Sequence, residues 1–253
     1  IKGWWSSVIR LGGVPTTRFW RDLESKFFQI PVLNITNEIW PGLSRNCTTI
    51  QMSNLTTPNG YQTSFYPCEA TEWKDTDQFL VDNKIQLLKD LPLSEQNIAF
   101  SLNKVIPKNS FVYLGNSLPI RFWDNYSSPQ STAKNLTVGG NRGANGIDGQ
   151  ISTFLGWASE KYENWGIFGD LTTLYDLNAL WIANKLSTSA LRIVLINNGG
   201  GQIFSRMFEQ TEFVNSHNLS FEYWAKMWGW TWSCHTHWNL DTLSDNQKIK
   251  KKH

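Results

Sequence analysis

The sequence predicts an α/β fold built on parallel strands, and two apolar runs carry most of that prediction. Residues 165–168 form a short apolar run that stops at Gly169-Asp170, and residues 192–196 form a second that stops at Asn197-Asn198. The helical interval between the runs is typical of a right-handed crossover between parallel neighbours. Strand, turn and helix signals also alternate over residues 1–56, which indicates a second parallel unit.

Composition indicates a globular protein with a large core. The 253 residues include 14 Trp and are 40% hydrophobic, which suffices for one large domain or two ordinary ones. Basic and acidic residues nearly balance at 23 to 21, so nothing favours a nucleic-acid partner, and the lysines near the carboxyl terminus are typical of a solvated tail. Three cysteines at wide spacings argue against a disulfide framework. No signal peptide or membrane span is evident in the sequence, so we expect a cytoplasmic protein.

The first part of the chain predicts three strands and one helix. Strands are expected over residues 7–11, 30–35 and 48–52. Gly12 to Pro15 form a turn, and Thr16 is the expected cap of a helix whose apolar positions are Phe19, Trp20, Leu23 and Phe27. Residues 55–72 lack periodicity and carry turn residues, so we interpret them as a linker.

Residues 73–253 predict a second α/β domain. Ser94 follows a Leu-Pro pair and is the expected N-cap of its second helix. The five tryptophans at positions 224–238 are explained by a core cluster. The expected elements are helices over 77–91 and 94–106, a strand over 110–114, helices over 118–126 and 149–160, the strand at 165–168, a crossover helix over 176–186, the strand at 192–196, and a helix followed by a strand within 220–243.

Asp170 and Asn198 are expected to meet beyond the sheet. The carboxyl ends of parallel strands face one crevice, and a carboxylate with an amide oxygen suits Mg²⁺ bridged to a diphosphate. Gly169 and residues 199–201 would let the backbone approach such a group, and helix starts would add N–H donors. Taken alone, Asp170 is more often a helix cap, and Asn197 is the alternative ligand to Asn198.

Three blocks of sequence carry a family resemblance. They are Asn-Arg-Gly-Ala-Asn-Gly-Ile-Asp-Gly at 141–149, Gly-Asp-Leu-Thr-Thr-Leu-Tyr-Asp-Leu-Asn-Ala-Leu at 169–180, and Asn-Asn-Gly-Gly-Gly-Gln-Ile-Phe at 197–204. The general thiamine-diphosphate motif reads Gly-Asp-Gly with Asn-Asn further along, whereas here Leu171 takes the third place. The combination resembles the 2-succinyl-5-enolpyruvyl-6-hydroxy-3-cyclohexene-1-carboxylate synthases, thiamine-dependent enzymes of menaquinone and phylloquinone synthesis. The resemblance is closest over residues 110–208 and thinner over residues 1–75, where Gly12, Pro15 and Arg18 resemble the family's central domain.

The resemblance implies a thiamine diphosphate site with a bound metal ion. It assigns Asp170, Asn198 and the backbone oxygen of Gly200 to Mg²⁺, for which Mn²⁺ could substitute. Ile147 would support the cofactor in a bent shape that brings its 4′-amino group to the thiazolium C2, although an isolated apolar residue in a Gly-rich loop is usually a packing anchor. The remaining cofactor contacts that the resemblance implies are Leu171, Gln202 and Ile203.

The resemblance also implies the substrates 2-oxoglutarate and isochorismate. Arg121 and Arg142 would hold substrate carboxylates, a task that suits the planar guanidinium, whereas a lone Arg is by default a surface charge. Ser117, Phe204 and Arg18 complete the implied substrate contacts.

The family resemblance bears on domain organisation and partners. In these enzymes a glutamate at the cofactor's pyrimidine ring comes from the amino-terminal domain of a second subunit, within a homodimer or homotetramer. The chain begins without Met, so we expect it to be a fragment that lacks this domain. We therefore interpret residues 1–72 as the end of a Rossmann-like central domain plus a linker, and residues 73–253 as a thiamine-diphosphate domain shortened at its carboxyl end. This portion alone is expected to be inactive.

Two other functions stay open at this point. A 2-oxoacid decarboxylase or an acetolactate-synthase relative would share the metal site but should read Gly-Asp-Gly and lack the block at 141–149. A non-catalytic cofactor-binding module is the second alternative. His235 and His237 share a predicted strand face, but no second ligand cluster accompanies them, which disfavours a metal site there.

Overall fold

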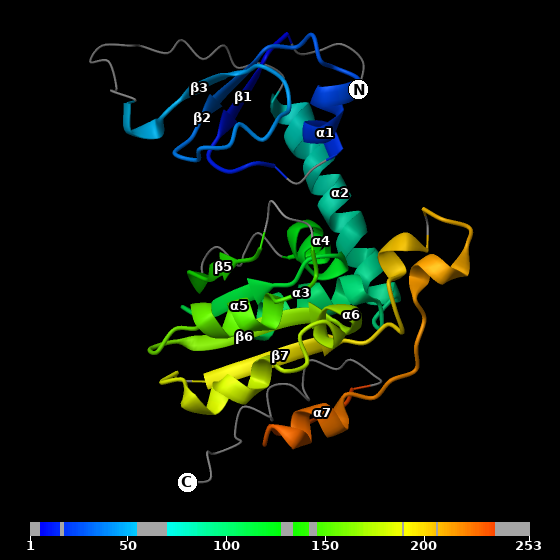
Figure 1. Ribbon diagram of the computed structural model, residues 1–253. Coiled ribbons are helices and arrows are strands. Elements are labelled where there is room, and N and C mark those ends of the chain that lie inside the picture. Colours follow the sequence, from blue (N-terminus) through cyan, green and yellow to red (C-terminus); the bar gives the residue numbers. More distant parts are fainter. Residues whose placement is uncertain are drawn as a thin grey trace. The chain divides into compact units, whose positions relative to one another are not determined.

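The chain folds as two compact units, residues 1–70 and residues 71–253. The computed structural model describes residues 6–15, 18–54, 70–127, 134–141, 146–188, 190–205 and 207–235 (Figure 1). Each unit holds one sheet in which all described strands run parallel, and this confirms the predicted α/β class. None of the helices in the described ranges is both long enough and apolar enough to cross a membrane.

The first unit is a three-stranded sheet with one α-helix packed on it. The strands β1 (Val8–Leu11), β2 (Val32–Ile35) and β3 (Thr48–Ile50) lie in that order, followed by the short η1 (Met52–Asn54). Helix α1 (Arg18–Ser25) buries Trp20 and Leu23 against Val32. These elements lie where the sequence predicts them, while the expected cap Thr16 lies outside the described residues.

The second unit contains a four-stranded sheet in the order β5-β4-β6-β7. Its strands are β4 (Phe111–Leu114), β5 (Thr137–Gly139), β6 (Glu163–Gly169) and β7 (Ala190–Ile196). The register pairs Ile167 of β6 with Leu114 on one side and Val194 on the other. The sequence does not predict β5, because three residues with two exposed side chains provide no apolar run to recognise.

The second unit differs from the prediction in three further places. Helix α2 begins at Ala70, seven residues before the predicted start. The sequence does not reveal this first part of the helix, because the described side chains at 74–80 are all exposed and show no apolar periodicity. The crossover between β6 and β7 is α6 followed by the 3-10 helix η3, not one α-helix. Residues 228–235 contain no strand, and residues 236–253 lie outside the described part. The helices are α2 (Ala70–Asp90), α3 (Glu95–Val105), α4 (Leu118–Tyr126), α5 (Gln150–Trp157), α6 (Asp170–Leu174), η3 (Ala179–Lys185), η4 (Gln202–Phe204), η5 (Thr211–Val214) and α7 (Glu222–Met227).

Asp176, the predicted first residue of the crossover helix, lies in the turn between α6 and η3, and its side chain contacts α5. The carboxylate of Asp176 accepts the Ser152 N–H at 2.7 Å and the Ser152 hydroxyl at 2.9 Å. These bonds satisfy a donor in the first turn of α5, as a capping carboxylate does.

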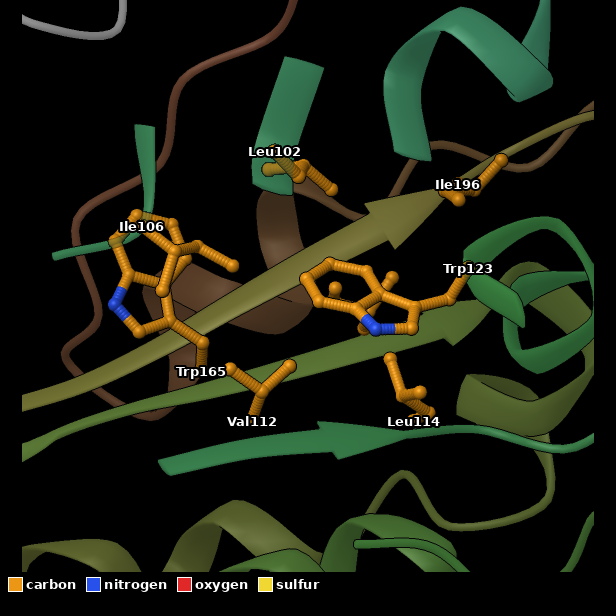
Figure 2. Close-up of a cluster of buried hydrophobic side chains, with 8 residues drawn as sticks. Leu102, Ile106, Val112, Leu114, Trp123, Trp165 and Ile196 are labelled. Atoms are coloured by element: carbon orange, nitrogen blue, oxygen red, sulfur yellow. The ribbon is translucent and has the colours of Figure 1, made fainter. Parts of the chain in front are cut away.

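One face of this sheet packs on α3 and α4. Figure 2 shows Trp123 of α4 pointing onto the strands, with Leu102 of α3 beside it. Side chains at alternate strand positions, such as Val112 and Leu114, supply the sheet's share of this core. Leu102 and Val112 are fully buried.

The opposite face carries Tyr113 and Phe168, which pack on α5 and η3. Phe154 of α5 meets the Phe168 ring edge-on with the centroids 5.9 Å apart. Trp224 of α7 packs against the same cluster and donates its indole N–H to the Leu177 carbonyl at 2.8 Å. The sheet is therefore covered on both faces, which explains why β6 reads as an unbroken apolar run.

Helix α3 is fixed at both ends by side chains. Ser94 is its N-cap, as predicted, and its hydroxyl oxygen accepts the Asn97 N–H at 3.2 Å. At the other end the ammonium of Lys134 donates to the carbonyls of Asn103, Lys104 and Ile106. Burial lowers the pKa of Lys134, and the charge of Lys108 adds to that effect. A cation at this position satisfies carbonyls that a helix end leaves without partners.

Replacing Lys134 with Met is expected to destabilise the second unit by about 1–3 kcal/mol, since several charge-assisted hydrogen bonds are lost. Urea denaturation followed by circular dichroism measures the change. The control is Lys108→Met, which removes an exposed lysine nearby. Equal unfolding midpoints for the two variants would show that the Lys134 contacts contribute nothing to stability.

Candidate functional site

The predicted site residues of the second unit follow strands that end at one edge of its sheet. Ser117 comes after β4, Ile147 after β5, Asp170 directly after β6, and Asn198 after β7. The chain leaves β4 towards β5 on one side and returns to β6 on the other side of β4, so the strand order reverses between β4 and β6. Ligands of open α/β sheets bind beyond the carboxyl ends of the strands at such a reversal.

Asp170 joins the ends of β6 and β7. The residue is 2% exposed, and its Oδ1 accepts the N–H of Leu171 at 2.7 Å, which is a local helix-start contact. Its Oδ2 accepts the N–H of Gly200 at 2.9 Å, across from the turn that follows β7. Asp170 therefore does more than cap α6, because one of its carboxylate oxygens is hydrogen-bonded to the turn after β7.

Asn198 is held by a carboxylate from a distant helix. Its Nδ2 donates to Oε1 of Glu95, the first residue of α3, at 2.8 Å. Burial raises the pKa of Glu95; the hydrogen bond from Asn198 opposes that effect, and the negative charge of Asp170 reinforces it. Asn197, the alternative ligand, instead donates its Nδ2 to the Leu219 carbonyl at 2.9 Å. Asn198 therefore keeps a buried side-chain oxygen that has no hydrogen-bond partner, which favours it over Asn197 as a ligand.

The turn after β7 requires glycine at Gly200. This residue has φ of +139°, and a Cβ there would lie 2.6 Å from the Val214 carbonyl oxygen. The neighbouring Gly201 donates its N–H to the same carbonyl. The 199–201 turn is therefore packed backbone to backbone against η5, a closeness that no other residue type permits.

His217 completes the surroundings of Asp170. Its backbone N–H donates to the Gly199 carbonyl at 3.0 Å, and its Nδ1 accepts the Leu219 N–H at 3.2 Å. Because Nδ1 is an acceptor, a neutral ring carries its proton on Nε2. Nε2 lies 3.2 Å from Oδ2 of Asp170, close enough for an ion pair but without the alignment of a hydrogen bond.

The loop that carries Ile147 is anchored by two buried polar side chains. Asn116 and Gln150 each donate a side-chain N–H to the Gly146 carbonyl, at 2.8 and 2.6 Å. The Oε1 of Gln150 in turn accepts the Asn116 backbone N–H at 2.8 Å. Both residues are at most 2% exposed, so buried hydrogen bonds hold Gly146, the residue before Ile147, in place. Ile147 itself is half-buried.

Most of the remaining predicted residues lie in the segments that follow β4 and β7, and one lies outside the described residues. Ser117 begins α4 with φ of +74°, and its carbonyl accepts the Arg121 guanidinium at 2.6 Å. Gln202 donates its Nε2 to the Asn198 carbonyl at 3.2 Å; Ile203 and Phe204 follow it in η4, the latter 39% exposed. Arg142 lies outside the described residues, as does His237 of the disfavoured histidine pair.

Arg18 belongs to the first unit. It pairs with Asp22 one helical turn away at 3.4 Å and is largely exposed.

Two residues of the site, Glu95 and His217, are missed by sequence reasoning. Glu95 reads as an ordinary acidic residue in the first turn of a helix, where the macrodipole favours it. His217 lies in an irregular segment with no periodicity. Both contacts depend on tertiary structure, so no local signal could have identified either residue.

The donor set fits a hard divalent cation. Asn198 Oδ1 and Glu95 Oε2 are buried and have no hydrogen-bond partner, an arrangement that is costly unless a cation or donor faces it. The described residues hold no cluster of three His, Cys, Asp or Glu side chains suited to a metal ion. A cation here would therefore rest on the Asp170 carboxylate, the Asn198 amide oxygen and a backbone carbonyl such as that of Gly200. Such oxygen ligands suit Mg²⁺ and Mn²⁺.

Comparison with known proteins gives one consistent result. No protein-family model matches the chain. Curated relatives carry the name 2-succinyl-5-enolpyruvyl-6-hydroxy-3-cyclohexene-1-carboxylate synthase. The Bdellovibrio bacteriovorus protein is 46% identical over 229 residues, covering 89% of this chain and 42% of the relative. The Akkermansia muciniphila protein is 33% identical over 262 residues, covering 95% and 47%, and the Bacillus pumilus protein is 41% identical over 147 residues, covering 55% and 25%.

The chain thus spans about half the length of the first two of these relatives. The name that the relatives share is that of the family expected from Leu171 and the three sequence blocks, not that of a decarboxylase or an acetolactate synthase. With 46% identity over 89% of its length, the chain belongs to the family of the 2-succinyl-5-enolpyruvyl-6-hydroxy-3-cyclohexene-1-carboxylate synthases.

Proposed function

We propose that this chain supplies the diphosphate-binding side of a thiamine-diphosphate-dependent synthase, which decarboxylates 2-oxoglutarate and adds the resulting four-carbon unit to isochorismate. The observation that carries the proposal is the meeting of Asp170 and the Asn197–Gly201 turn at the carboxyl edge of the sheet. The Gly200 N–H joins the two at 2.9 Å. Family membership supplies the reaction class, and this geometry supplies a place for the cofactor's charged end.

The residues of the chain have separate tasks in this proposal. Asp170, Asn198 and the Gly200 carbonyl would hold Mg²⁺, or Mn²⁺ in its place, and through it the diphosphate. Ile147 would support the middle of the cofactor from a loop that Asn116 and Gln150 already hold in place. Leu171, Gln202 and Ile203 would line the remaining cofactor surface. When bound, thiamine diphosphate supplies the electron sink for the loss of CO₂ from a 2-oxoacid.

The substrate contacts proposed are Arg121, Ser117, Phe204, Arg142 and Arg18. Arg121 is an exposed cation at the start of the helix that follows β4, which places it at the same edge as Asp170. Both substrates carry carboxylates, and a guanidinium binds a carboxylate through two parallel hydrogen bonds.

Arg121→Leu is expected to weaken binding of 2-oxoglutarate or isochorismate by about 1.5–3 kcal/mol for each charged hydrogen bond lost, while the affinity for thiamine diphosphate stays constant. Isothermal titration with each ligand separates the two effects. Arg121→Lys keeps the charge without the planar fork, so it should fall between the native chain and the Leu variant. A parallel loss of cofactor affinity would instead make Arg121 a structural residue, acting through the Ser117 carbonyl.

Catalysis in this proposal needs a further domain that covers the cofactor's pyrimidine ring. We expect that domain to come from a second subunit in a homodimer or homotetramer, and the reaction to run in the cytoplasm. The chain and the unmatched remainder of the Bdellovibrio bacteriovorus relative, expressed as a second polypeptide, provide the test. CO₂ release from 2-oxoglutarate, with Mg²⁺ and thiamine diphosphate, is measured for the chain alone and for the mixture.

We expect turnover in the mixture and none by the chain alone. Asp170→Ala should abolish the turnover of the mixture. Robust turnover by the chain alone would overturn the proposal that the active site lies between two domains. Tight cofactor binding without turnover in the mixture would favour the non-catalytic binding module.

A further inference from the structure

We propose that Glu95 is a positioning residue for the metal site: it holds the side-chain amide of Asn198 so that Oδ1, and not Nδ2, faces the cation. The inference rests on the proposed function, because it concerns the same metal site. It assigns a task to a residue on α3, outside the strand ends that supply the proposed ligands.

The first argument is the chemistry of the contact. Asn198 Nδ2 lies 2.8 Å from Glu95 Oε1. An asparagine amide could present either its oxygen or its nitrogen to a neighbour, and only the oxygen can bind a cation. An ionised carboxylate only accepts hydrogen bonds, so Glu95 selects the orientation in which the nitrogen turns towards α3. The Oδ1 of Asn198 then remains buried and without a hydrogen-bond partner, which leaves it able to bind a cation.

The second argument is the rigidity of the support. Glu95 is the first residue of α3, directly after the Ser94 cap. The helix is anchored in the core by Leu102, which is fully buried, and Ile106 just after its end is fully buried as well. On the opposite side, Gln202 donates to the Asn198 backbone carbonyl at 3.2 Å. Asn198 is thus held through its side chain by Glu95 and through its backbone by Gln202, and ligands fixed in this way bind metal more tightly.

The test measures Mn²⁺ binding by electron paramagnetic resonance, with thiamine diphosphate present and the 253-residue chain as the protein. Glu95→Leu removes the acceptor at similar volume, and we expect the Mn²⁺ affinity to fall about 10- to 100-fold, as is usual for the loss of a partner that orients a ligand. Glu95→Gln keeps an oxygen that can accept from Asn198, but its amide nitrogen can also donate to Asn198 Oδ1, so its affinity should fall between those of the native chain and the Leu variant. Glu222→Leu is the matched control, since it removes a carboxylate from the first turn of α7.

A second pair of variants covers the case in which Glu95→Leu fails to fold. Asn198→Asp places a second carboxylate against Glu95, and the repulsion should weaken Mn²⁺ binding. Adding Glu95→Gln restores a hydrogen bond with the roles of donor and acceptor exchanged, and it should recover most of the affinity. Recovery would show that the contact between these two side chains sets the Mn²⁺ affinity, and a lack of recovery would count against the inference.

The outcomes separate the inference from the function on which it rests. If the native chain does not bind Mn²⁺ in the presence of thiamine diphosphate, the proposed metal site itself is wrong. If the native chain binds and Glu95→Leu matches it within threefold, only the positioning role is overturned. If Glu95→Gln loses as much affinity as Glu95→Leu, Glu95 acts through its charge or as a direct ligand, and the positioning role is again overturned.

Discussion

Replacing Asp170 with Ala is expected to abolish Mg²⁺-dependent binding of thiamine diphosphate. The side chain is almost fully buried at the junction of β6 and the turn after β7, and it supplies the only carboxylate among the three proposed ligands. Without it, the diphosphate would face the site with no cation to neutralise its charge. Isothermal titration with thiamine diphosphate at saturating Mg²⁺ measures the effect.

Asp90→Ala serves as the control for Asp170→Ala, because it removes an exposed carboxylate of the same unit that contacts only Gln86 at 3.0 Å among the described interactions. Urea denaturation of both variants separates a binding defect from unfolding, since Asp170 also accepts two backbone N–H groups. Unchanged cofactor affinity in a folded Asp170→Ala chain would refute the metal assignment.

Gly200→Ala is expected to destabilise the second unit by about 2–4 kcal/mol and to displace the turn that carries Asn198. Two costs add at this position. The φ of +139° is unfavourable for any residue with a Cβ, and the new methyl group would lie 2.6 Å from the Val214 carbonyl oxygen. That oxygen is backbone, so it cannot swing away as the end of a side chain could. Chemical denaturation gives the change in the free energy of unfolding.

Gly229→Ala is the matched comparison for Gly200→Ala. Gly229 has φ of +75° but open space around its Cβ position, so only the conformational cost of about 1 kcal/mol applies. Equal midpoints for the two variants would show that the turn yields easily, and that its close packing against η5 contributes little.

The parallel architecture could be predicted from the sequence because the central strands are buried on both faces. β6 is the best example, since five of its seven residues are buried and the run ends abruptly at Gly169 and Asp170. Strand β5 lacked that signal because its side chains are mostly exposed. The tryptophans after residue 220 indicated a core cluster, and Trp224, Trp228 and Trp230 pack on α5 and η3. Residues 228–235 contain no strand, and the rest of the segment in which the sequence predicts one lies outside the described residues.

Only those residues of the candidate site that belong to a sequence motif could be predicted. Asp170 and Asn198 each follow a recognisable strand, so their meeting at one edge follows from topology alone. The partners that hold them have no such signature. Glu95 reaches Asn198 from a helix far earlier in the chain, and His217 reaches Asp170 from an irregular segment. Residue roles that depend on tertiary contacts of this kind need the fold itself before they can be inferred.

The hydrogen bond between Glu95 and Asn198 also has a consequence for folding. It joins residues 103 positions apart, whereas the strand pairs around it join segments much closer in sequence. Closing so long a loop costs entropy that is recovered only when most native contacts are in place. Helix α3 and the end of β7 are separated in the sequence by β4, β5 and β6, so we expect them to meet only after these strands have paired. Cation binding should therefore appear at the end of folding, after the secondary structure, and its recovery in a refolding experiment would report that the unit is complete.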